Sequence, residues 1–299
     1  MRLDDPRNKL VHVFMDAVDS LRPRSFLMEN VDNLGTKPLF KPILDKLTER
    51  AKSLGYACQR RVLDTHNFDV PQSRNRLIFV GFRGTAVPVQ YFHELAAFSR
   101  QGQTCGEALQ DIGRAGTPSN PATCNAKIVL CKNPVLRGSA YSGMLFNGSG
   151  RPLAPTRPSP TLLAAMGGNA TPIIDEEQFF GAGGSWVENL HAALVERKAL
   201  ASAASEAVAW VAPESVRRLT VKEAARLQTF PHDYVFKGGI NAAYTQIGNA
   251  VPCNFAYALA QAVAKVLREL APTPVAADGA SRASRPRSRS PRRAQRIAE

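Results

Sequence analysis

Apolar residues follow helical and strand spacings over the first third of the chain. Residues 10–21 and 38–54 each place an apolar residue every three or four positions, which predicts two amphipathic helices. Residues 25–28, 58–64 and 76–82 are short apolar or alternating runs, which predict strands. The order helix, strand, helix, strand, strand is typical of an α/β sheet with helices on its faces.

The rest of the chain falls into parts of different texture. Residues 85–155 are rich in Gly, Pro, Asn, Thr and Ser without regular spacing, so we expect a small loop-rich insertion. Order returns in residues 156–270, where Thr220 and Glu223 predict a capping box, a loop-prone run follows, and a closing helix covers residues 255–270. The expected division of the chain is 1–84, 85–155, 156–270 and a tail, 271–299.

The net charge of +13 is unevenly shared along the chain. The tail holds seven arginines and two acidic residues, so five of these net positive charges lie there and eight lie on the rest. A basic body indicates a polyanionic partner such as nucleic acid, although many basic proteins bind none. The tail alternates Ser and Arg with little apolar content, so we expect it to be disordered.

Cysteine usage and hydropathy set further bounds. The five cysteines form no C-x-x-C pair, which argues against a disulfide framework or a zinc site. No continuous run approaches the roughly 20 apolar residues of a membrane span, and no signal-peptide core begins the chain. We expect a metal-free protein of the reducing cytoplasm.

One carboxylate has an unusual position. The strand expected at residues 25–28 runs directly into Glu29 and then into a turn rich in Asn, Asp and Gly. Ligands of α/β sheets bind at the carboxyl ends of strands, so Glu29 is a candidate site residue. The alternative interpretation is an acid that caps the following loop.

Three separated segments resemble the later signature motifs of DNA cytosine-5 methyltransferases, in that family's order: FLMENV, QSRNRLIFVGF, and RRLTVKEAARLQTFP with YTQIGNAVP. DPRNKL, YSGMLFNGSGRP and PTLLAAMGGNATPIID also resemble bacterial members. The resemblance implies an α/β fold, namely the back half of a Rossmann-like S-adenosylmethionine-dependent methyltransferase sheet, with residues 85–155 as a target-recognition insertion. It also implies a bacterial, nucleoid-associated protein of a restriction-modification or solitary type.

The chemistry of that family gives Glu29 an implied role. A thiolate adds to cytosine C6, C5 takes a methyl group from S-adenosylmethionine, and a carboxyl group assists at the ring nitrogen N3. By resemblance Glu29 is that group, with Asn30 and Val31 shaping the pocket. The base must leave the stack to be reached, so double-stranded DNA is the implied partner and base flipping the implied mode.

Gln72, Arg74 and Arg76 match the family's Gln-x-Arg-x-Arg motif. The resemblance implies that Arg76 binds the flipped base at its O2 edge and holds Glu29, that Arg74 supports the loop or a phosphate, and that Gln72 belongs to the base pocket. The alternative is a solvated surface pair ahead of a strand.

Asn249, Ala250 and Val251 match the final family motif. They are the implied contacts to S-adenosylmethionine, and the alternative is an ordinary turn before Pro252.

Two motifs of the family are not found in this sequence: the Pro-Cys-Gln loop that carries the nucleophile and the Phe-x-Gly-x-Gly loop. The resemblance therefore implies no nucleophile among the five cysteines and an incomplete cofactor site. We expect a carboxy-terminal portion of such an enzyme, inactive alone, with an unpaired strand edge that a polypeptide carrying the amino-terminal half covers. A non-catalytic DNA-binding remnant is the alternative.

Overall fold

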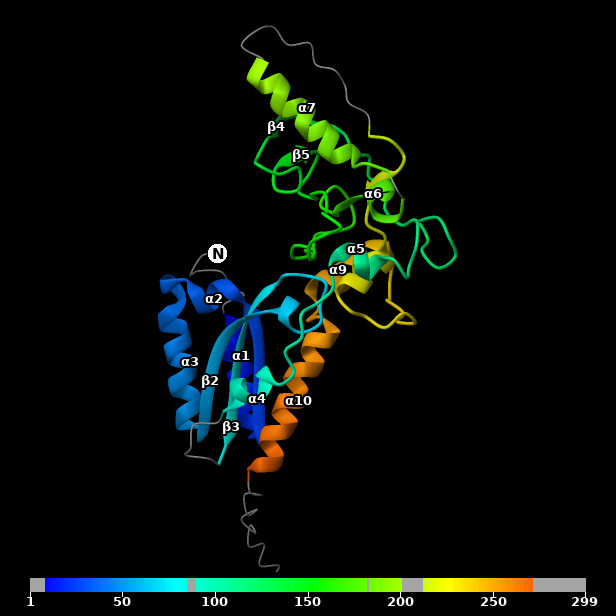
Figure 1. Ribbon diagram of the computed structural model, residues 1–299. Coiled ribbons are helices and arrows are strands. Elements are labelled where there is room, and N and C mark those ends of the chain that lie inside the picture. Colours follow the sequence, from blue (N-terminus) through cyan, green and yellow to red (C-terminus); the bar gives the residue numbers. More distant parts are fainter. Residues whose placement is uncertain (1–8, 85–89, 182, 201–211, 271–299) are drawn as a thin grey trace, which may run out of the picture.

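The computed structural model has two lobes joined by a long helix (Figure 1). It describes residues 9–84, 90–181, 183–200 and 212–270. The tail from residue 271, expected to be disordered, lies outside the described residues.

A three-stranded antiparallel sheet is the centre of the first lobe, here called the sheet lobe. β3 (Asn75–Arg83) lies between β1 (Ser25–Val31) and β2 (Tyr56–Asp64), so β1 and β2 are edge strands. β1 extends two residues beyond Glu29, which therefore lies within the strand, opposite Ile78 of β3.

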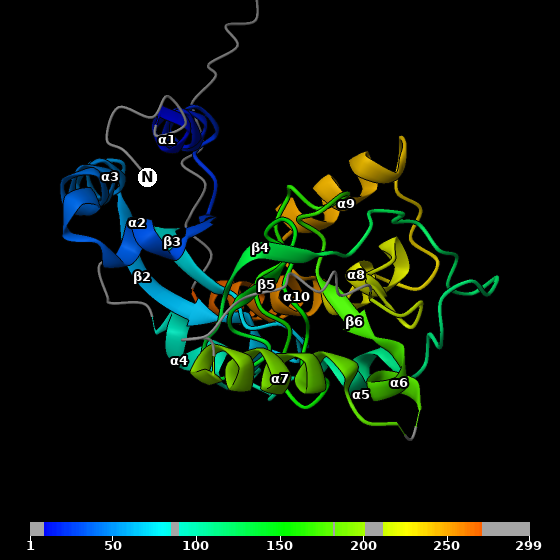
Figure 2. The same ribbon diagram turned by 90° about the horizontal axis from the view of Figure 1, so that it is seen from above.

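Helices cover both faces of this sheet (Figure 2). α1 (Leu10–Leu21) and α3 (Lys41–Ser53) pack on one face, in a core that includes Leu77 and Phe79. α4 (Tyr91–Ala96) and α10 (Cys253–Glu269) pack on the other, against Ile78, Val80 and Phe82. The alternation follows from the two-residue period of a strand, and it confirms the predicted α/β layering.

The second, loop-rich lobe holds most of residues 104–249 and has two cores of its own. One joins α5, α8 and α9, and the other joins α7 to the small strands. Its elements are α5 (Cys105–Leu109), β4 (Leu130–Val135), β5 (Met144–Phe146), β6 (Ile173–Asp175), α6 (Glu176–Phe180), α7 (Trp186–Leu200), β7 (Val216–Arg218), α8 (Val221–Leu227) and α9 (Ile240–Asn249). Short helical turns in the sheet lobe are α2 (Asp32–Thr36), η2 (Pro38–Phe40) and η3 (Thr65–Asn67).

Two local predictions have clear outcomes. The capping box is confirmed: the Thr220 side chain accepts from Glu223 N, and the Glu223 side chain accepts from Thr220 N. The run before Pro252 was expected to be a loop and is instead helix α9, because Ala243, Tyr244 and Ile247 form a buried stripe at helical spacing.

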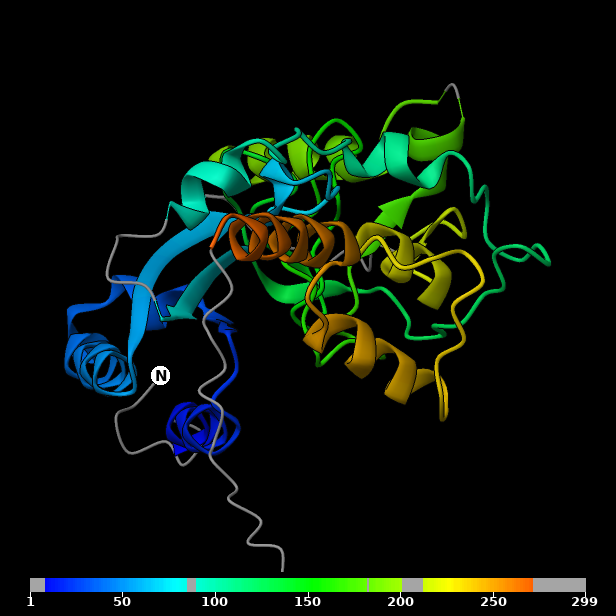
Figure 3. The same cartoon turned by 90° about the horizontal axis from the view of Figure 1, so that it is seen from below.

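The boundary expected after residue 84 stays a prediction, although α4 belongs to the core of the sheet lobe: Tyr91 Oη donates to Leu259 O of α10 at 3.1 Å. α10 runs from this core to the loop-rich lobe, where α9 precedes it (Figure 3). By length and apolar content alone, Ile240–Glu269 could cross a membrane, a test that core helices also meet.

Candidate active site

Glu29 and Arg76 form an ion pair on the α10 side of the sheet. Arg76 Nε lies 2.7 Å from Glu29 Oε1, and their side chains are 11% and 24% exposed. The strand register explains the contact: Arg76 is directly opposite Val31, and Glu29 lies two residues away on the same face, within reach of a long side chain. The pair that the sequence predicted is therefore in contact and remains open to solvent on one side.

An apolar groove of about 430 Å³ adjoins this pair. Its walls are Leu27 and Glu29 of β1, Val251, and small or branched residues of α10, namely Ala256, Leu259, Ala260, Val263, Ala264 and Leu267. The groove thus brings a predicted base-binding residue and a predicted cofactor-binding residue, 222 positions apart, to one surface.

The other residues of the final motif lie at the end of α9. Asn249 is its last residue and has an exposed side chain, and the Ala250 N–H caps the helix by donating to Gln246 O and Ile247 O. Asn30 is half-buried, and its side-chain oxygen accepts from Val31 N at 2.8 Å. This bond stiffens the end of β1 beside Glu29.

Arg74 points away from this surface. It is 5% exposed, and Nη1 donates to Leu162 O at 3.1 Å and to Gly248 O at 3.0 Å. Burial, with a smaller contribution from Arg76, lowers the pKa of Arg74 to about 10, so it stays charged at neutral pH. Arg74 is therefore bound to backbone carbonyl groups and is too buried for a phosphate to reach, and its loop-supporting role stays a prediction.

Gln72 lies at the junction of the two lobes, and its place in the base pocket stays a prediction. It is fully buried, its Oε1 accepts from Leu162 N at 2.8 Å, and its Nε2 donates to Gln228 Oε1 at 3.0 Å. Gln228 Nε2 in turn donates to Ile247 O at 2.8 Å. Through these hydrogen bonds Gln72 joins the two lobes.

Sequence reasoning missed three residues at this junction: Leu162, Gln228 and Asp64. Leu162 takes part through its backbone, which no side-chain pattern reveals. Asp64, at the end of β2, accepts from His66 N, Ser73 Oγ and Arg74 N and so closes the loop that leads into β3. A carboxylate that directly precedes the loop leading to the Gln-x-Arg-x-Arg motif is a sequence signal for this loop-closing role.

None of the five cysteines lines the groove beside Glu29. Cys58 faces the opposite side of the sheet, next to Phe79, and burial raises its pKa to about 11. Cys105 is fully buried in the loop-rich lobe, where burial raises its pKa to about 12. Burial also raises the pKa of Cys253. Among the described residues, no three His, Cys, Asp or Glu side chains are grouped to hold a metal ion.

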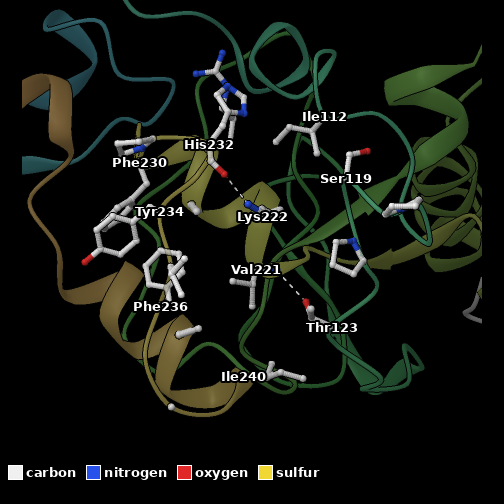
Figure 4. A pocket seen from close by; sticks show the side chains of 18 of the residues that line it. Ile112, Ser119, Thr123, Val221, Lys222, Phe230, His232, Tyr234, Phe236 and Ile240 are labelled. Atoms are coloured by element: carbon white, nitrogen blue, oxygen red, sulfur yellow. Dashed lines mark hydrogen bonds between the residues drawn. The ribbon is translucent and has the colours of Figure 1, made fainter.

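A larger cavity, of about 610 Å³, lies in the loop-rich lobe between α8, α9 and the segment after α5 (Figure 4). Three mutually packed rings, Phe230, Tyr234 and Phe236, form one wall, with centroids 4.8 to 5.1 Å apart. Lys222 Nζ donates to His232 O at 2.6 Å across it. None of the predicted site residues lines this cavity, so we place the candidate active site at Glu29 and Arg76.

Comparison with known proteins decides the family. Residues 1–265 match the C-5 cytosine-specific DNA methylase family. The chain belongs to this family. We expected the chain to resemble only the carboxy-terminal portion of such an enzyme. This expectation is wrong, because the family match covers residues 1–265, which is most of the chain.

Individual members of the C-5 cytosine methylase family are distant relatives. The chain is 29% identical to the type II methyltransferase M1.HphI of Haemophilus parahaemolyticus over 88% of its length and 62% of that protein. It is 30% identical to M.XorII of Xanthomonas oryzae, over 89% of the chain and 64% of that protein. The chain therefore spans less than two thirds of the length of these relatives.

A solved structure supports the α/β methyltransferase fold. Dnmt2 methyltransferase of S. pombe superposes with a TM-score of 0.54 and 16% identity, over 90% of this chain and 74% of that one. At this identity the likeness concerns the fold alone.

Proposed function

We propose that this protein takes part in methylation of cytosine C5 in double-stranded DNA, with S-adenosylmethionine as methyl donor. The observation that carries the proposal is the contact between Glu29 and Arg76 beside a groove that also contains Val251. A carboxylate and a guanidinium on one open surface can together hold the N3 and O2 edge of a flipped cytosine.

Within this site the two side chains have different tasks. Glu29 supplies a hydrogen bond or proton at N3, where negative charge develops when the ring is attacked at C6. Arg76 donates to O2 and fixes the Glu29 carboxylate, whose Oε1 lies 2.7 Å from Arg76 Nε. Asn30 and Val31 hold the end of β1 in place. Asn249 to Val251 contact the cofactor, which brings the methyl group to C5 when bound.

The thiolate that attacks C6 is none of this chain's five cysteines. Cys58 and Cys105 are buried away from Glu29, and burial disfavours their thiolates. Cys124 and Cys131 belong to the loop-rich lobe, and Cys253 does not line the groove. We therefore assign the attacking sulfur to a polypeptide segment outside these 299 residues, which also completes the cofactor site.

The free edge of β1 and the apolar groove along α10 are the surface for that polypeptide. Edge strands carry unpaired backbone groups, and the groove is almost entirely apolar. Covering both would remove apolar surface from water and enclose the Glu29–Arg76 pair. Such enclosure strengthens its interactions with a bound base.

The test is expression of the gene, with and without the coding sequences that flank it, in a host that lacks cytosine methylation. Bisulfite sequencing of the host genome reads each methylated cytosine and its sequence context. We expect methylation only in the combined expression. Methylation by these 299 residues alone would refute the assignment of the sulfur to a segment outside them, and no methylation in either case would refute the proposed function.

Glu29→Gln tests the carboxyl group directly. The amide is nearly isosteric and still bonds N3, but it does not deliver a proton, so the rate of methyl transfer should fall by about 10²- to 10⁴-fold with little change in DNA affinity. Arg76→Ala is the matched comparison and should reduce both the rate and the binding of the flipped base. A near-normal rate for Glu29→Gln means that Glu29 only caps the strand end.

A further inference from the structure

The backbone N–H and C=O of Leu162 are both bound by residues of the Gln-x-Arg-x-Arg motif. Its N–H donates to Gln72 Oε1 at 2.8 Å, and its carbonyl accepts from Arg74 Nη1 at 3.1 Å. Both side chains are 5% exposed or less. Two successive peptide groups of the loop-rich lobe, on either side of the Leu162 Cα, are therefore each bound by a side chain of the sheet lobe.

The same two side chains also hold the end of α9. Arg74 Nη1 donates to Gly248 O at 3.0 Å, and Gln72 reaches Ile247 O through Gln228. The last carbonyl groups of a helix have no partner within the helix and carry partial negative charge. A buried arginine at this point satisfies one of them and is stabilised by the helix dipole.

Close backbone packing adds to these bonds. A Cβ atom on Gly248 would lie 2.4 Å from the backbone of Leu163 and Ala164, so α9 contacts the segment after Leu162 directly. Nearby, Asn254 N donates to Thr229 Oγ1, and its side chain donates to Asp69 O. Asp69 and Thr229 both have positive φ, at 58° and 57°, a conformation that non-glycine residues keep only where surrounding contacts hold it.

We propose that Gln72, Arg74 and Gln228 form a clamp, the Leu162 clamp, that fixes the Asn249–Val251 segment relative to Glu29 and Arg76. Arg74 is then a positioning residue that touches neither DNA nor base. The residues of the motif then have two different roles. Arg76, on β3, lies in the site. Gln72 and Arg74, in the preceding loop, set the distance between the base contacts and the cofactor contacts. The claim that the clamp positions cofactor contacts rests on the proposed function. The existence of the clamp does not.

Hydrogen exchange of the full chain tests the clamp without any activity. Arg74→Met and Gln72→Met keep apolar bulk and remove the hydrogen bonds. We expect backbone exchange to become at least tenfold faster both around residues 161–164 and around 247–251. Arg76→Met, the same change in the same motif, should leave both segments protected, and Arg74→Lys should restore part of the protection. Faster exchange in only one segment, or in neither, overturns the clamp.

Salt dependence of DNA binding separates a clamp from a phosphate contact. Affinity for a duplex of arbitrary sequence is measured by fluorescence anisotropy over a range of salt concentrations. Loss of one phosphate contact lowers the slope of log affinity against log salt by about 0.9. We expect Arg74→Met to keep the wild-type slope, and a fall of that size would show that Arg74 contacts phosphate and overturn the proposal.

Cofactor affinity tests the positioning role, in the complex purified after expression together with the flanking coding sequences. Arg74→Met should weaken S-adenosylmethionine binding by about tenfold and change DNA affinity by less than twofold. Equal losses of both, or loss of neither, contradict a positioning role. If the wild-type complex binds no S-adenosylmethionine, the proposed function fails, and the exchange and salt measurements still decide the clamp.

Discussion

Replacing Gly248 with alanine should destabilise the protein, although helix propensity alone predicts the opposite. Gly248 lies in α9, and alanine is favoured over glycine within a helix by about 1 kcal/mol. The added methyl group, however, would lie 2.4 Å from Ala164 N and from the carbonyl carbon and oxygen of Leu163. The two effects have opposite signs, so the measurement decides between them.

The size of the steric effect follows from what would have to move. Ordinary contacts of a Cβ atom begin at 3.4 Å, so the facing backbone must shift by about 1 Å. These are backbone atoms, and the N–H and C=O of the adjoining Leu162 are held by Gln72 and Arg74. Overpacking costs about 1 to 3 kcal/mol, and the rigid surroundings favour the upper value. After the propensity gain, the net loss is about 2 kcal/mol.

Thermal unfolding followed by circular dichroism measures this loss. A change of about 2 kcal/mol should lower the midpoint by about 4 to 8 °C in a domain of this size. Gly168→Ala is the control, because a Cβ atom at Gly168 meets nothing within 4 Å, and it should change stability by less than about 0.5 kcal/mol. A Gly248→Ala protein as stable as wild type, or more stable, would refute the close contact between α9 and Leu163.

Two further predictions concern Asp64 and Cys58. Asp64→Ala removes the acceptor of three hydrogen bonds and should lower the free energy of unfolding, measured in urea, by about 1 to 3 kcal/mol. Asp64→Asn keeps an acceptor for the two backbone donors and should lower it less. Equal losses would contradict the loop-closing role. Burial raises the pKa of Cys58 to about 11, so its alkylation, followed by mass spectrometry, should be slow at pH 8 and rise about tenfold per pH unit up to pH 10; a rate that levels off near pH 9 would contradict this.

The sequence was informative wherever one segment carries its own signal. The strand pattern and the match to family motifs predicted that Glu29 and Arg76 belong together, and the register of β1 against β3 puts them 2.7 Å apart. The capping box at Thr220 and Glu223 is likewise a local device, readable from four consecutive residues.

The roles of Gln72 and Arg74 were not readable in this way. Both bind backbone groups 88 to 174 positions away along the chain, and backbone groups have no residue-specific pattern. Helix α9 was missed for a related reason. The run that ends in Pro252 was expected to be a loop, yet it forms a helix in which Gly248 is required by the close approach of Leu163.

The position of α10 also has a consequence for how the protein is made. α4 and the sheet pack against α10, which is translated last among the described elements. Tyr91 of α4 and Leu259 of α10, which form a hydrogen bond, are 168 positions apart. At about 5 to 20 residues per second, ribosomes need about 10 to 30 s to bridge that interval. During this time Ile78, Val80 and Phe82 lack the cover of α10, so the nascent chain exposes apolar surface on this face of the sheet.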